Sequence, residues 1–477
     1  MGADSPFVSE PACLLLAQDA DVGQHSQADN GHGGRETGAA GRSDRLSWAM
    51  RSLEGCHPEM ANANVAVVGL GYVGLPTAIS FAESGCCVIG IDTSEERLAA
   101  IKAGFVDLLN VDHERLRRHL GSESFALTTN PALLASAHAV IICVPTPIDS
   151  YLVPDLSALS AACDTVIQYV VPGQLIVLTS TTYVGCTRHL LVESLVERGL
   201  RVGEDVFVAF SPERLDPGNA EHSHESIPRV IGGVTGACQR RAVELLRRIT
   251  SNAYPVSSPE SAEMTKLLEN SFRAVNIALV NEFADACHEL RLDILEIIKA
   301  ATTKPYGYMP FLPGPGVGGH CIPCDPHYLL WQLRARRSRL PVTETAMASI
   351  ATRPRHIVAR VREILSESGH GVSGARVLLV GVAYKPDVSD LRGSPALEIM
   401  SELLDAGAKV AFSDPMVDSI KISDRVFRGV TPSSRRRWDL VVVHTLHSGV
   451  DYSWLTQFPV VLDATYRAVH VPNRIMP

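Results

Sequence analysis

Short apolar runs alternate with longer amphipathic stretches from residue 64 to the end of the chain. The first six runs have the length and composition of buried strands: 65–69, 87–91, 139–143, 175–179, 206–210 and 229–231. The stretches between them repeat apolar residues at helical spacing, as at 76–84, 156–170 and 187–198. Apolar strands that alternate with amphipathic helices predict an α/β fold, in which a parallel sheet is covered by helices on both faces.

The middle of the chain has a different pattern. Residues 258–301 contain no Pro or Gly after Pro259 and predict one long, nearly unbroken helical region. Its apolar residues recur at helical steps, for example Phe272, Val275, Leu279 and Phe283. Residues 304–326 are dense in Pro and Gly, which predicts an ordered loop or a series of turns, and helical segments follow between 328 and 366.

Strand and helix alternate again in the last third of the chain. We expect a helix at 395–406 and strands at 376–382, 409–412, 440–444 and 460–462. The order strand, glycine-containing turn, helix, glycine, strand and acid thus occurs twice, ending first at Asp92 and then at Asp414. Because 477 residues are too many for a single core, this echo predicts two Rossmann-like doubly wound domains, 61–256 and 351–477, joined by a central helical segment at 257–350. Both ligands would lie at the carboxyl ends of strands and face each other across a cleft.

Residues 1–60 differ from the rest of the chain. Residues 19–44 are rich in Gly, Ser, Asp, Gln and His and have few large apolar side chains, so burial cannot offset the entropy lost on ordering. They lack the basic start and apolar stretch of a signal peptide, and they contain acids that a transit peptide avoids. We expect a disordered tail, for which the sequence indicates no function.

Composition narrows the functional classes. The net charge of -9 leaves no basic surplus to displace counterions from phosphates, which argues against a nucleic-acid-binding protein. No apolar run reaches the ~20 residues that span a bilayer, so no membrane association is expected. Scattered cysteines in a chain without a secretory signal indicate reduced thiols in a cytoplasmic protein.

The turn after the first strand carries a dinucleotide-binding motif. Gly69 allows a tight turn, Gly71 lets backbone approach a pyrophosphate, and Gly74 lets helix and strand pack closely. Asp92 lies about twenty residues on, at the end of the next strand, where it would bond a ribose 2′-hydroxyl and repel a 2′-phosphate. The motif therefore predicts NAD rather than NADP as the cofactor.

Hydroxyl side chains follow two later strands of the same predicted sheet. Thr146 lies in a Val-Pro-Thr-Pro segment, and Thr181 lies in a Thr-Ser-Thr-Thr segment. Both could face the cofactor or the substrate, and both could equally belong to ordinary turns. Spacing alone does not separate these two interpretations.

Residues 314–325 are the most unusual stretch of the chain. Four glycines and a proline precede Cys321 and fix a backbone that presents both amides and a thiol, which becomes a nucleophile only as a thiolate. Asp325 would share a helical face with Cys321 if 322–325 forms a turn of helix. Lys266 and Asn270, four residues apart on the long helix, would project side by side and could supply a cation and an amide donor to a developing oxyanion.

Each of these residues also has a structural interpretation. A single Cys is usually a small buried hydrophobe, and Cys324 is a rival nucleophile. Lys266 could be a solvated helix residue. His320 could be a base or a metal ligand, but we expect a structural role for it and no metal site. The residues alone favour Cys321 as a nucleophile only slightly.

Six stretches taken together resemble the UDP-glucose/GDP-mannose dehydrogenase family: 65–74, 143–147, 211–218, 266–270, 314–328 and 381–395. The resemblance leaves only the N-terminal tail uncovered, and its most specific part is the segment Pro-Gly-Pro-Gly-Val-Gly-Gly-His-Cys-Ile-Pro. It implies a four-electron dehydrogenase, in which two NAD molecules oxidise the C6 alcohol of a nucleotide-linked sugar through an aldehyde to an acid.

The resemblance implies a role for each candidate catalytic residue. Cys321 would attack the aldehyde to give a thiohemiacetal, and a second hydride transfer would leave a thioester for water to hydrolyse. Lys266 and Asn270 would stabilise oxyanions along the path. Asp325 and Thr146 would position the water that takes or gives protons.

Further roles follow from the same resemblance. Glu213 would assist thioester hydrolysis, Lys385 would reach the substrate, and Arg392 would meet the NAD phosphates. The long helix resembles the family's dimerisation helix, so a homodimer through 258–301 is expected. The candidate cofactor-binding residues are Gly69, Gly71, Tyr72, Val73, Gly74, Asp92, Arg97, Thr146, Thr181 and Arg392. The candidate substrate-binding residues are Glu213, Arg214, Lys266, Asn270, Gly318, Gly319 and Lys385.

The resemblance also narrows the substrate. Residues 211–218 read Ser-Pro-Glu-Arg-Leu-Asp-Pro-Gly, whereas glucose-oxidising members commonly carry Glu where Pro217 stands. This form resembles the branch that acts on UDP-N-acetylhexosamines, especially UDP-N-acetylglucosamine, with UDP-glucose and UDP-N-acetylmannosamine as alternatives. Residues 184–187 read Val-Gly-Cys-Thr where Pro-Gly-Thr-Thr is usual, which could alter the nicotinamide pocket. Arg353 precedes Pro354 where Met-Pro is common, and we expect a smaller effect from this departure in the linker.

Two other functions remain open at this point. A two-electron dehydrogenase on the same scaffold, such as one for hydroxy acids, would not need Cys321. A non-catalytic NAD-binding protein would need none of the candidate catalytic groups, so their joint presence disfavours it.

Overall fold

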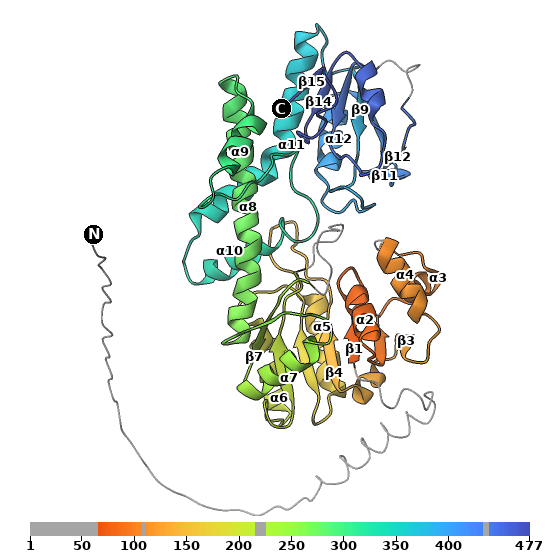
Figure 1. Ribbon diagram of the computed structural model, residues 1–477, viewed down its shortest axis with the longest axis vertical. Coiled ribbons are helices and arrows are strands. Elements are labelled where there is room, and N and C mark those ends of the chain that lie inside the picture. Colours follow the sequence, from red (N-terminus) through yellow and green to blue (C-terminus); the bar gives the residue numbers. More distant parts are fainter. Residues whose placement is uncertain (1–64, 107–109, 215–225, 433–437) are drawn as a thin grey trace, which may run out of the picture. The chain divides into compact units, whose positions relative to one another are not determined.

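The computed structural model describes residues 65–106, 110–214, 226–432 and 438–477 (Figure 1). The tail expected at 1–60 lies outside the described residues, and so does Pro217. Among the described residues, no helix combines the length and the apolar character that crossing a membrane requires.

An eight-stranded sheet occupies the N-terminal part of the described chain, with the strand order β3-β2-β1-β4-β5-β6-β7-β8. Its strands are β1 (Val65–Val68), β2 (Val88–Ile91), β3 (Phe125–Thr128), β4 (Ala139–Ile142), β5 (Leu175–Leu178), β6 (Phe207–Phe210), β7 (Arg229–Gly233) and β8 (Ala253–Val256). The first six follow the order of a dinucleotide-binding sheet, whose switch point lies between β1 and β4. The predicted α/β fold is therefore confirmed. The sheet is not wholly parallel, because β7 runs antiparallel to β6, and the sequence did not predict β3 or β8.

Alternate residues of each strand pack against opposite helical layers. In β1, Val65 and Val67 belong to a buried cluster with residues of α2 (Gly74–Glu83) and α7 (Gly236–Leu246). Ala66 belongs to the opposite cluster, with residues of α5 (Ser157–Tyr169). Because both faces are buried, these strands read as continuous apolar runs.

The remaining helices of this part lie in the connections from β2 to β4 and from β5 to β6. They are α3 (Glu95–Ala103), α4 (Asn110–His119), η3 (Pro131–Ser136), η4 (Arg188–Val192) and α6 (Glu193–Glu197). The single helix expected at 187–198 is wrong in detail, because η4 is a π-helical turn that precedes α6.

Four helices follow the first sheet: α8 (Pro259–Glu289), α9 (Ile294–Thr302), α10 (Asp325–Ala335) and α11 (Pro341–Glu367). The α8 helix begins where the Ser258 hydroxyl accepts the Ser261 N–H at 3.2 Å, and it packs against α10 and α11. The region expected to be nearly unbroken is interrupted after Glu289. Arg291 adopts a left-handed φ of 57°, and the Asp293 carboxylate accepts the Leu295 N–H at 2.8 Å to start α9.

A second sheet occupies the C-terminal part, and all its strand pairs are parallel, in the order β10-β9-β13-β14-β15. Its elements are β9 (Arg376–Val380), α12 (Pro395–Asp405), β10 (Lys409–Ser413), β13 (Leu440–Val443), η5 (Ser453–Gln457), β14 (Val461–Asp463) and β15 (Arg474–Ile475). A separate antiparallel pair, β11 (Ser419–Ile422) and β12 (Arg425–Arg428), follows β10.

The internal echo seen in the sequence is present in the backbone. Gly69 and Gly381, after the first strand of each sheet, have φ values of 86° and 78°. The next residue donates its N–H to the following acid in both copies, to Asp92 at 2.8 Å and to Asp414 at 2.7 Å. Asp414 also contacts His447 Nε2 at 3.3 Å and has no exposed side-chain surface, so the second acid serves the structure of its own turn.

Candidate active site

The turn between β1 and α2 has the backbone that the glycine motif predicts. A Cβ on Gly69 would lie 2.7 Å from the carbonyl oxygen of Cys143, and a Cβ on Gly74 would overlap the carbonyl oxygen of Gly69. A Cβ on Gly71 would meet nothing within 4 Å. The first and third glycines are therefore required by packing, whereas the second leaves backbone open to an approaching pyrophosphate.

Two charged side chains bind the backbone of Leu70, the second residue of this turn. The Asp92 carboxylate, after β2, accepts the Leu70 N–H at 2.8 Å and the Ser94 N–H at 3.0 Å. Arg97 donates its Nε–H to the Leu70 carbonyl at 2.9 Å. Asp92 thus stands at the strand end where a dinucleotide ribose is bound in such sheets.

Arg392 reaches this turn from the segment that precedes α12. Its guanidinium carbon lies 4.3 Å from the centre of the Tyr72 ring, in cation–π contact. Asp390 orients the guanidinium by accepting hydrogen bonds of 2.9 Å from Nε and 2.6 Å from Nη2. The structure therefore brings Tyr72 and Arg392 together, although more than three hundred residues separate them in the sequence.

Lys266, Asn270, Asp325 and Glu213 form one connected group. Lys266 Nζ donates to the carbonyl oxygen of Glu213 at 2.7 Å, and the Asn270 amide donates to the Asp325 carboxylate. Only 8% of Lys266 and 4% of Asp325 are exposed. The spacing of Lys266 and Asn270 on α8 puts both on one face of the helix, as expected.

Asp325 lies in an environment that disfavours its charge. Burial raises the pKa of Asp325 to about 6, although the Lys266 cation and the Asn270 hydrogen bond act in the opposite direction. A carboxyl group with a pKa close to the working pH can both take and give a proton, as acid–base catalysis requires.

The Glu213 carboxylate is held in place by two arginines. It accepts Arg229 Nη2–H at 2.7 Å and the backbone N–H of Arg214 at 2.8 Å. The Arg214 guanidinium pairs with Glu269 of α8 at 2.7 Å, so it is already engaged within the protein. Sequence reasoning missed Arg229, whose signal was a charged residue at the head of an apolar strand.

Cys321 lies in the turn that leads into α10. Its carbonyl oxygen accepts the Asp325 N–H at 2.8 Å, so the turn has helical geometry and holds the two residues four apart. Cys321 is exposed, whereas burial raises the pKa of the Cys324 thiol to about 11. Among the described residues neither thiol forms a disulfide, although the two stand in a Cys-x-x-Cys spacing, and the rival Cys324 remains protonated near neutral pH.

The glycines before Cys321 pack against the segment that follows β9. Gly319 has a φ of 81° and donates its N–H to the Arg392 carbonyl at 3.0 Å. A Cβ on Gly318 or Gly319 would lie 2.7 or 2.8 Å from atoms of Tyr384. Lys385 Nζ lies 5.7 Å from the centre of the same ring. Glycine is therefore required here by the close approach of Tyr384, which the sequence did not single out.

Hydroxyl groups line the carboxyl ends of the central strands. The Thr146 carbonyl accepts the Tyr328 hydroxyl at 3.1 Å, and Thr181 is half-buried after β5. The buried Ser211 hydroxyl after β6 has no hydrogen-bond partner among the described residues. An unpaired buried hydroxyl at the sheet edge that also bears the Gly69 turn, with β4 and β5 between them, fits an edge that receives a polar ligand.

Comparison with known families shows which family the chain belongs to. Residues 63–250 match the NAD binding domain of the UDP-glucose/GDP-mannose dehydrogenase family, residues 260–349 match its central domain, and residues 378–468 match its UDP binding domain. The chain belongs to this family. It is an NAD-dependent nucleotide-sugar dehydrogenase.

Relatives of this dehydrogenase act on more than one sugar. It is 34% identical over 394 residues to UDP-N-acetyl-D-glucosamine 6-dehydrogenase of Pseudomonas aeruginosa, which covers 82% of the chain and 92% of the relative. It is also 34% identical over 387 residues to UDP-N-acetyl-D-mannosamine dehydrogenase of Pyrococcus horikoshii, covering 80% and 89%. The solved structure of UDP-D-ManNAc dehydrogenase from Pyrococcus horikoshii superposes with a TM-score of 0.77 at 32% identity, covering 84% and 95%.

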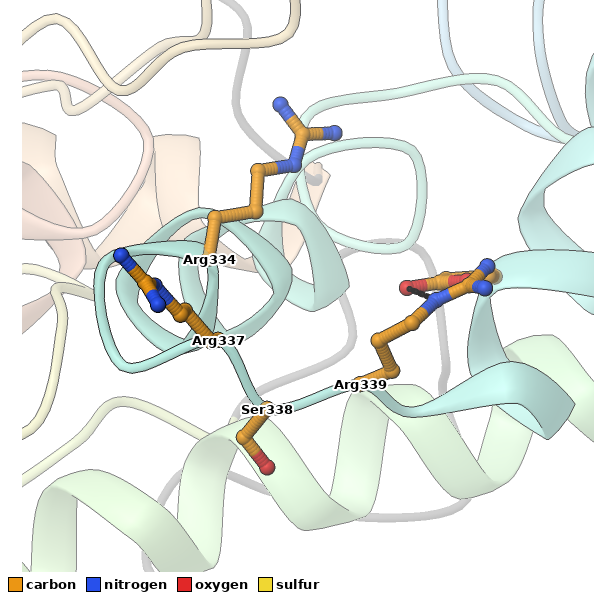
Figure 2. A pocket seen from close by; sticks show the side chains of 5 residues that line it. Arg334, Arg337, Ser338 and Arg339 are labelled. Carbon is orange, nitrogen blue, oxygen red and sulfur yellow. Dashed lines mark hydrogen bonds and ion pairs between the residues drawn. The ribbon is translucent and has the colours of Figure 1, made fainter.

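A surface hollow between α10 and α11 lies apart from these residues in the dehydrogenase. Its lining side chains are Arg334, Arg337, Ser338, Arg339 and Glu344 (Figure 2). Arg339 pairs with Glu344 at 2.5 Å, and the labelled arginines point in different directions rather than toward one centre. None of the candidate catalytic or binding residues lines this hollow.

Proposed function

We propose that this dehydrogenase oxidises the C6 alcohol of a UDP-N-acetylhexosamine, specifically UDP-N-acetylglucosamine, to the uronic acid. The oxidation removes four electrons and passes through a thiohemiacetal and a thioester on Cys321. The observation that carries the proposal is the group of buried Lys266, half-buried Asn270 and buried Asp325, held one turn from an exposed cysteine.

The open backbone at Gly71 and the acid at Asp92 fit the adenosine diphosphate part of NAD, which supplies the hydride acceptor. In the first step the C6 hydroxyl gives its proton to Asp325, directly or through a water that Asp325 and Thr146 hold. The Lys266 cation and an Asn270 N–H stabilise the alkoxide that develops as hydride leaves C6.

In the second stage the Cys321 thiolate adds to the aldehyde carbon, and Lys266 and Asn270 again stabilise the oxyanion. Loss of a second hydride from C6 leaves a thioester on Cys321. Water then adds to this carbonyl with the assistance of Glu213, the carbon–sulfur bond breaks, and the thiolate leaves. Alcohol, water and two NAD⁺ thus give carboxylate, two NADH and three protons.

The substrate assignment rests on likeness to relatives. The matched UDP binding domain supports a UDP-linked sugar. Relatives named for N-acetylglucosamine and for N-acetylmannosamine are both 34% identical to the chain, so the configuration at C2 is the point to test. Residues 211–218 read Ser-Pro-Glu-Arg-Leu-Asp-Pro-Gly, and Pro217 is the position whose identity resembles the acetamido branch.

We also propose that a second copy of the chain covers the outer face of α8. Four large apolar side chains at helical spacing are 47–64% exposed there: Leu268, Phe272, Leu279 and Phe283. A contiguous apolar stripe of this length is a typical association surface, and two-fold pairing is the commonest arrangement in soluble oligomers. A wild-type protein that sediments as a monomer at micromolar concentration would contradict the homodimer.

The decisive experiment measures NADH absorbance at saturating NAD with UDP-N-acetylglucosamine, UDP-N-acetylmannosamine, UDP-glucose and GDP-mannose. The proposal predicts two NADH per sugar consumed, with the highest kcat/KM for UDP-N-acetylglucosamine. Cys321→Ser should release no acid, whereas the matched control Cys324→Ser should retain turnover, because the half-buried Cys324 thiol of the wild type stays protonated and does not react. One NADH per sugar with free aldehyde, or full turnover by Cys321→Ala, would instead favour a two-electron dehydrogenase.

A further inference from the structure

The loop that follows β5, residues 183–187, is fastened by side chains from two separate helices. Glu263 of α8 accepts three hydrogen bonds from it: Gly185 N–H at 2.5 Å, Thr187 N–H at 2.9 Å and the Thr187 hydroxyl at 2.7 Å. Only 1% of Glu263 is exposed. A carboxylate buried this deeply is tolerated only where donors satisfy its oxygens, so the loop and α8 are fixed to one another.

Gln332 of α10 holds the same loop from another side. Its Oε1 accepts the Val184 N–H at 3.1 Å, and its Nε2–H donates to the Val184 carbonyl at 2.7 Å. The side-chain amide thus pairs with both polar backbone groups of one residue, as a neighbouring strand would. Trp331, beside Gln332, packs edge-on against the Tyr183 ring at 5.7 Å.

The two helices that hold the loop are the helices that carry the candidate catalytic groups. Glu263 precedes Lys266 by three residues and Asn270 by seven, so all three lie on one face of α8. Gln332 follows Asp325 by seven residues, which places both on one side of α10. Because α8 and α10 are stiff, their side chains hold the loop at a fixed distance from Lys266, Asn270 and Asp325, the groups proposed to contact the substrate.

The loop stands where the nicotinamide end of the cofactor is expected. It follows the carboxyl end of β5, at the sheet edge that also bears the Gly69 turn after β1. In sheets of this order the dinucleotide lies across that edge. A shift of the loop relative to Lys266 would therefore change how the hydride acceptor meets C6 of the sugar.

The identity of residue 184 matters for this arrangement. Val184 donates its N–H to Gln332, and a proline at this position would have no N–H to donate. The hydrogen bond from Val184 to Gln332 is therefore possible only with a residue other than proline.

We propose that Gln332 and Glu263 are positioning residues, which lock loop 183–187 to α10 and α8 and so set the geometry of hydride transfer. Neither side chain reacts. This inference rests on the proposed function for its kinetic consequence, because hydride transfer falls steeply when the reacting atoms are misplaced by about 1 Å. The predicted effect on NAD affinity does not depend on the proposed function, because it requires only that the matched NAD binding domain binds NAD.

The test compares Gln332→Leu with the matched control Arg334→Leu. Arg334 is an exposed residue of α10, two residues after Gln332. Gln332→Leu should lower kcat by about tenfold or more with little change in the KM for the sugar. With sugar deuterated at C6, the isotope effect on kcat should increase, because hydride transfer becomes slower than the other steps. Arg334→Leu should change neither quantity.

Two more variants grade the effect. In Glu263→Gln the amide oxygen can still accept the Thr187 hydrogen bonds, but the amide nitrogen cannot accept the one from Gly185. Glu263→Gln should therefore have a smaller kinetic effect than Glu263→Ala. Val184→Pro removes one hydrogen bond to Gln332, so its effect and that of Gln332→Leu should not add in the double variant. Additive effects would overturn the proposed pairing.

Failure of this inference and failure of the proposed function give different results. If the wild type forms no NADH with any UDP-sugar, the proposed function fails, and calorimetric titration with NAD alone still tests the loop. Gln332→Leu should then bind NAD several-fold more weakly than Arg334→Leu. A variant that only melts earlier, with unchanged NAD affinity and isotope effect, would show a merely structural role and overturn the inference.

Discussion

Replacement of Asp325 by asparagine should stabilise the protein near neutral pH while it removes the proposed proton carrier. Asp325 is 4% exposed, and burial raises its pKa to about 6 from 3.8 despite Lys266 and Asn270. The ionised carboxylate is therefore less stable in the folded protein than in the unfolded chain, where water solvates it. An asparagine side chain at this position carries no charge, and its oxygen can still accept the hydrogen bond from Asn270.

The magnitude follows from the pKa. A rise from 3.8 to about 6 corresponds to about 3 kcal/mol, at about 1.4 kcal/mol for each tenfold change in acidity constant. Because the folded-state pKa is the higher one, the stability that this carboxyl contributes is fully present below about pH 3.8 and is lost as the pH rises through about 6. The free energy of unfolding of Asp325→Asn should exceed that of the wild type by about 1.5 kcal/mol at pH 5 and about 3 kcal/mol at pH 8.

Urea denaturation of both proteins between pH 5 and pH 8 measures this difference, and the other titrating groups cancel in the comparison. Asp405→Asn, at the exposed end of α12, serves as the control for loss of a surface carboxylate and should change the free energy of unfolding by less than about 0.5 kcal/mol. A difference for Asp325→Asn that is flat with pH, or that grows in favour of the wild type, would refute the raised pKa. The proton-transfer role would then have to be assigned elsewhere.

Three further substitutions test the site. Gly74→Ala should lower the free energy of unfolding by about 1–3 kcal/mol in chemical denaturation, because its Cβ would overlap the Gly69 carbonyl. Asp92→Asn should raise the KM for NAD by about tenfold or more in steady-state assays, because a charge-assisted hydrogen bond to the ribose is lost. It should also reduce the preference for NAD over NADP, because the charge that repels a 2′-phosphate is removed. Arg229→Met should cost about 3 kcal/mol in chemical denaturation, because it leaves the Glu213 carboxylate without the guanidinium that now contacts it at 2.7 Å.

Local pattern predicted most of the fold. The apolar runs located the central strands of both sheets because those strands are buried on both faces and leave a strong signal. The pattern could not show that β7 reverses direction, since an apolar run reads the same either way. It also missed the break after α8, where Arg291 takes a left-handed conformation without glycine. Strand direction and such breaks are decided by tertiary packing.

The candidate site was only partly accessible to sequence reasoning. Helical spacing paired Lys266 with Asn270, and the glycine motif marked the turn after β1, because both are local. The contacts of Tyr384 with Gly318 and of Arg392 with Tyr72 join distant segments, so no local pattern encodes them. Glu263 was passed over because a glutamate on a long helix is usually solvated, whereas this one is buried.

The departure at Arg353, expected to matter little, lies at an anchor of the Cys321 loop. Its buried guanidinium donates to the Gly314 carbonyl at 3.1 Å and to Asp285 of α8 at 2.6 Å. A buried cation persists only where acceptors surround it, so the start of the loop is fixed to α8 and α11 together. Val184 and Arg353 share one property: each donates a hydrogen bond that proline or methionine at these positions could not supply, through a backbone N–H and a guanidinium. The Val184 hydrogen bond holds loop 183–187 to α10, and the Arg353 hydrogen bond holds the start of the Cys321 loop to α11. Both residues thus fix backbone next to proposed catalytic groups.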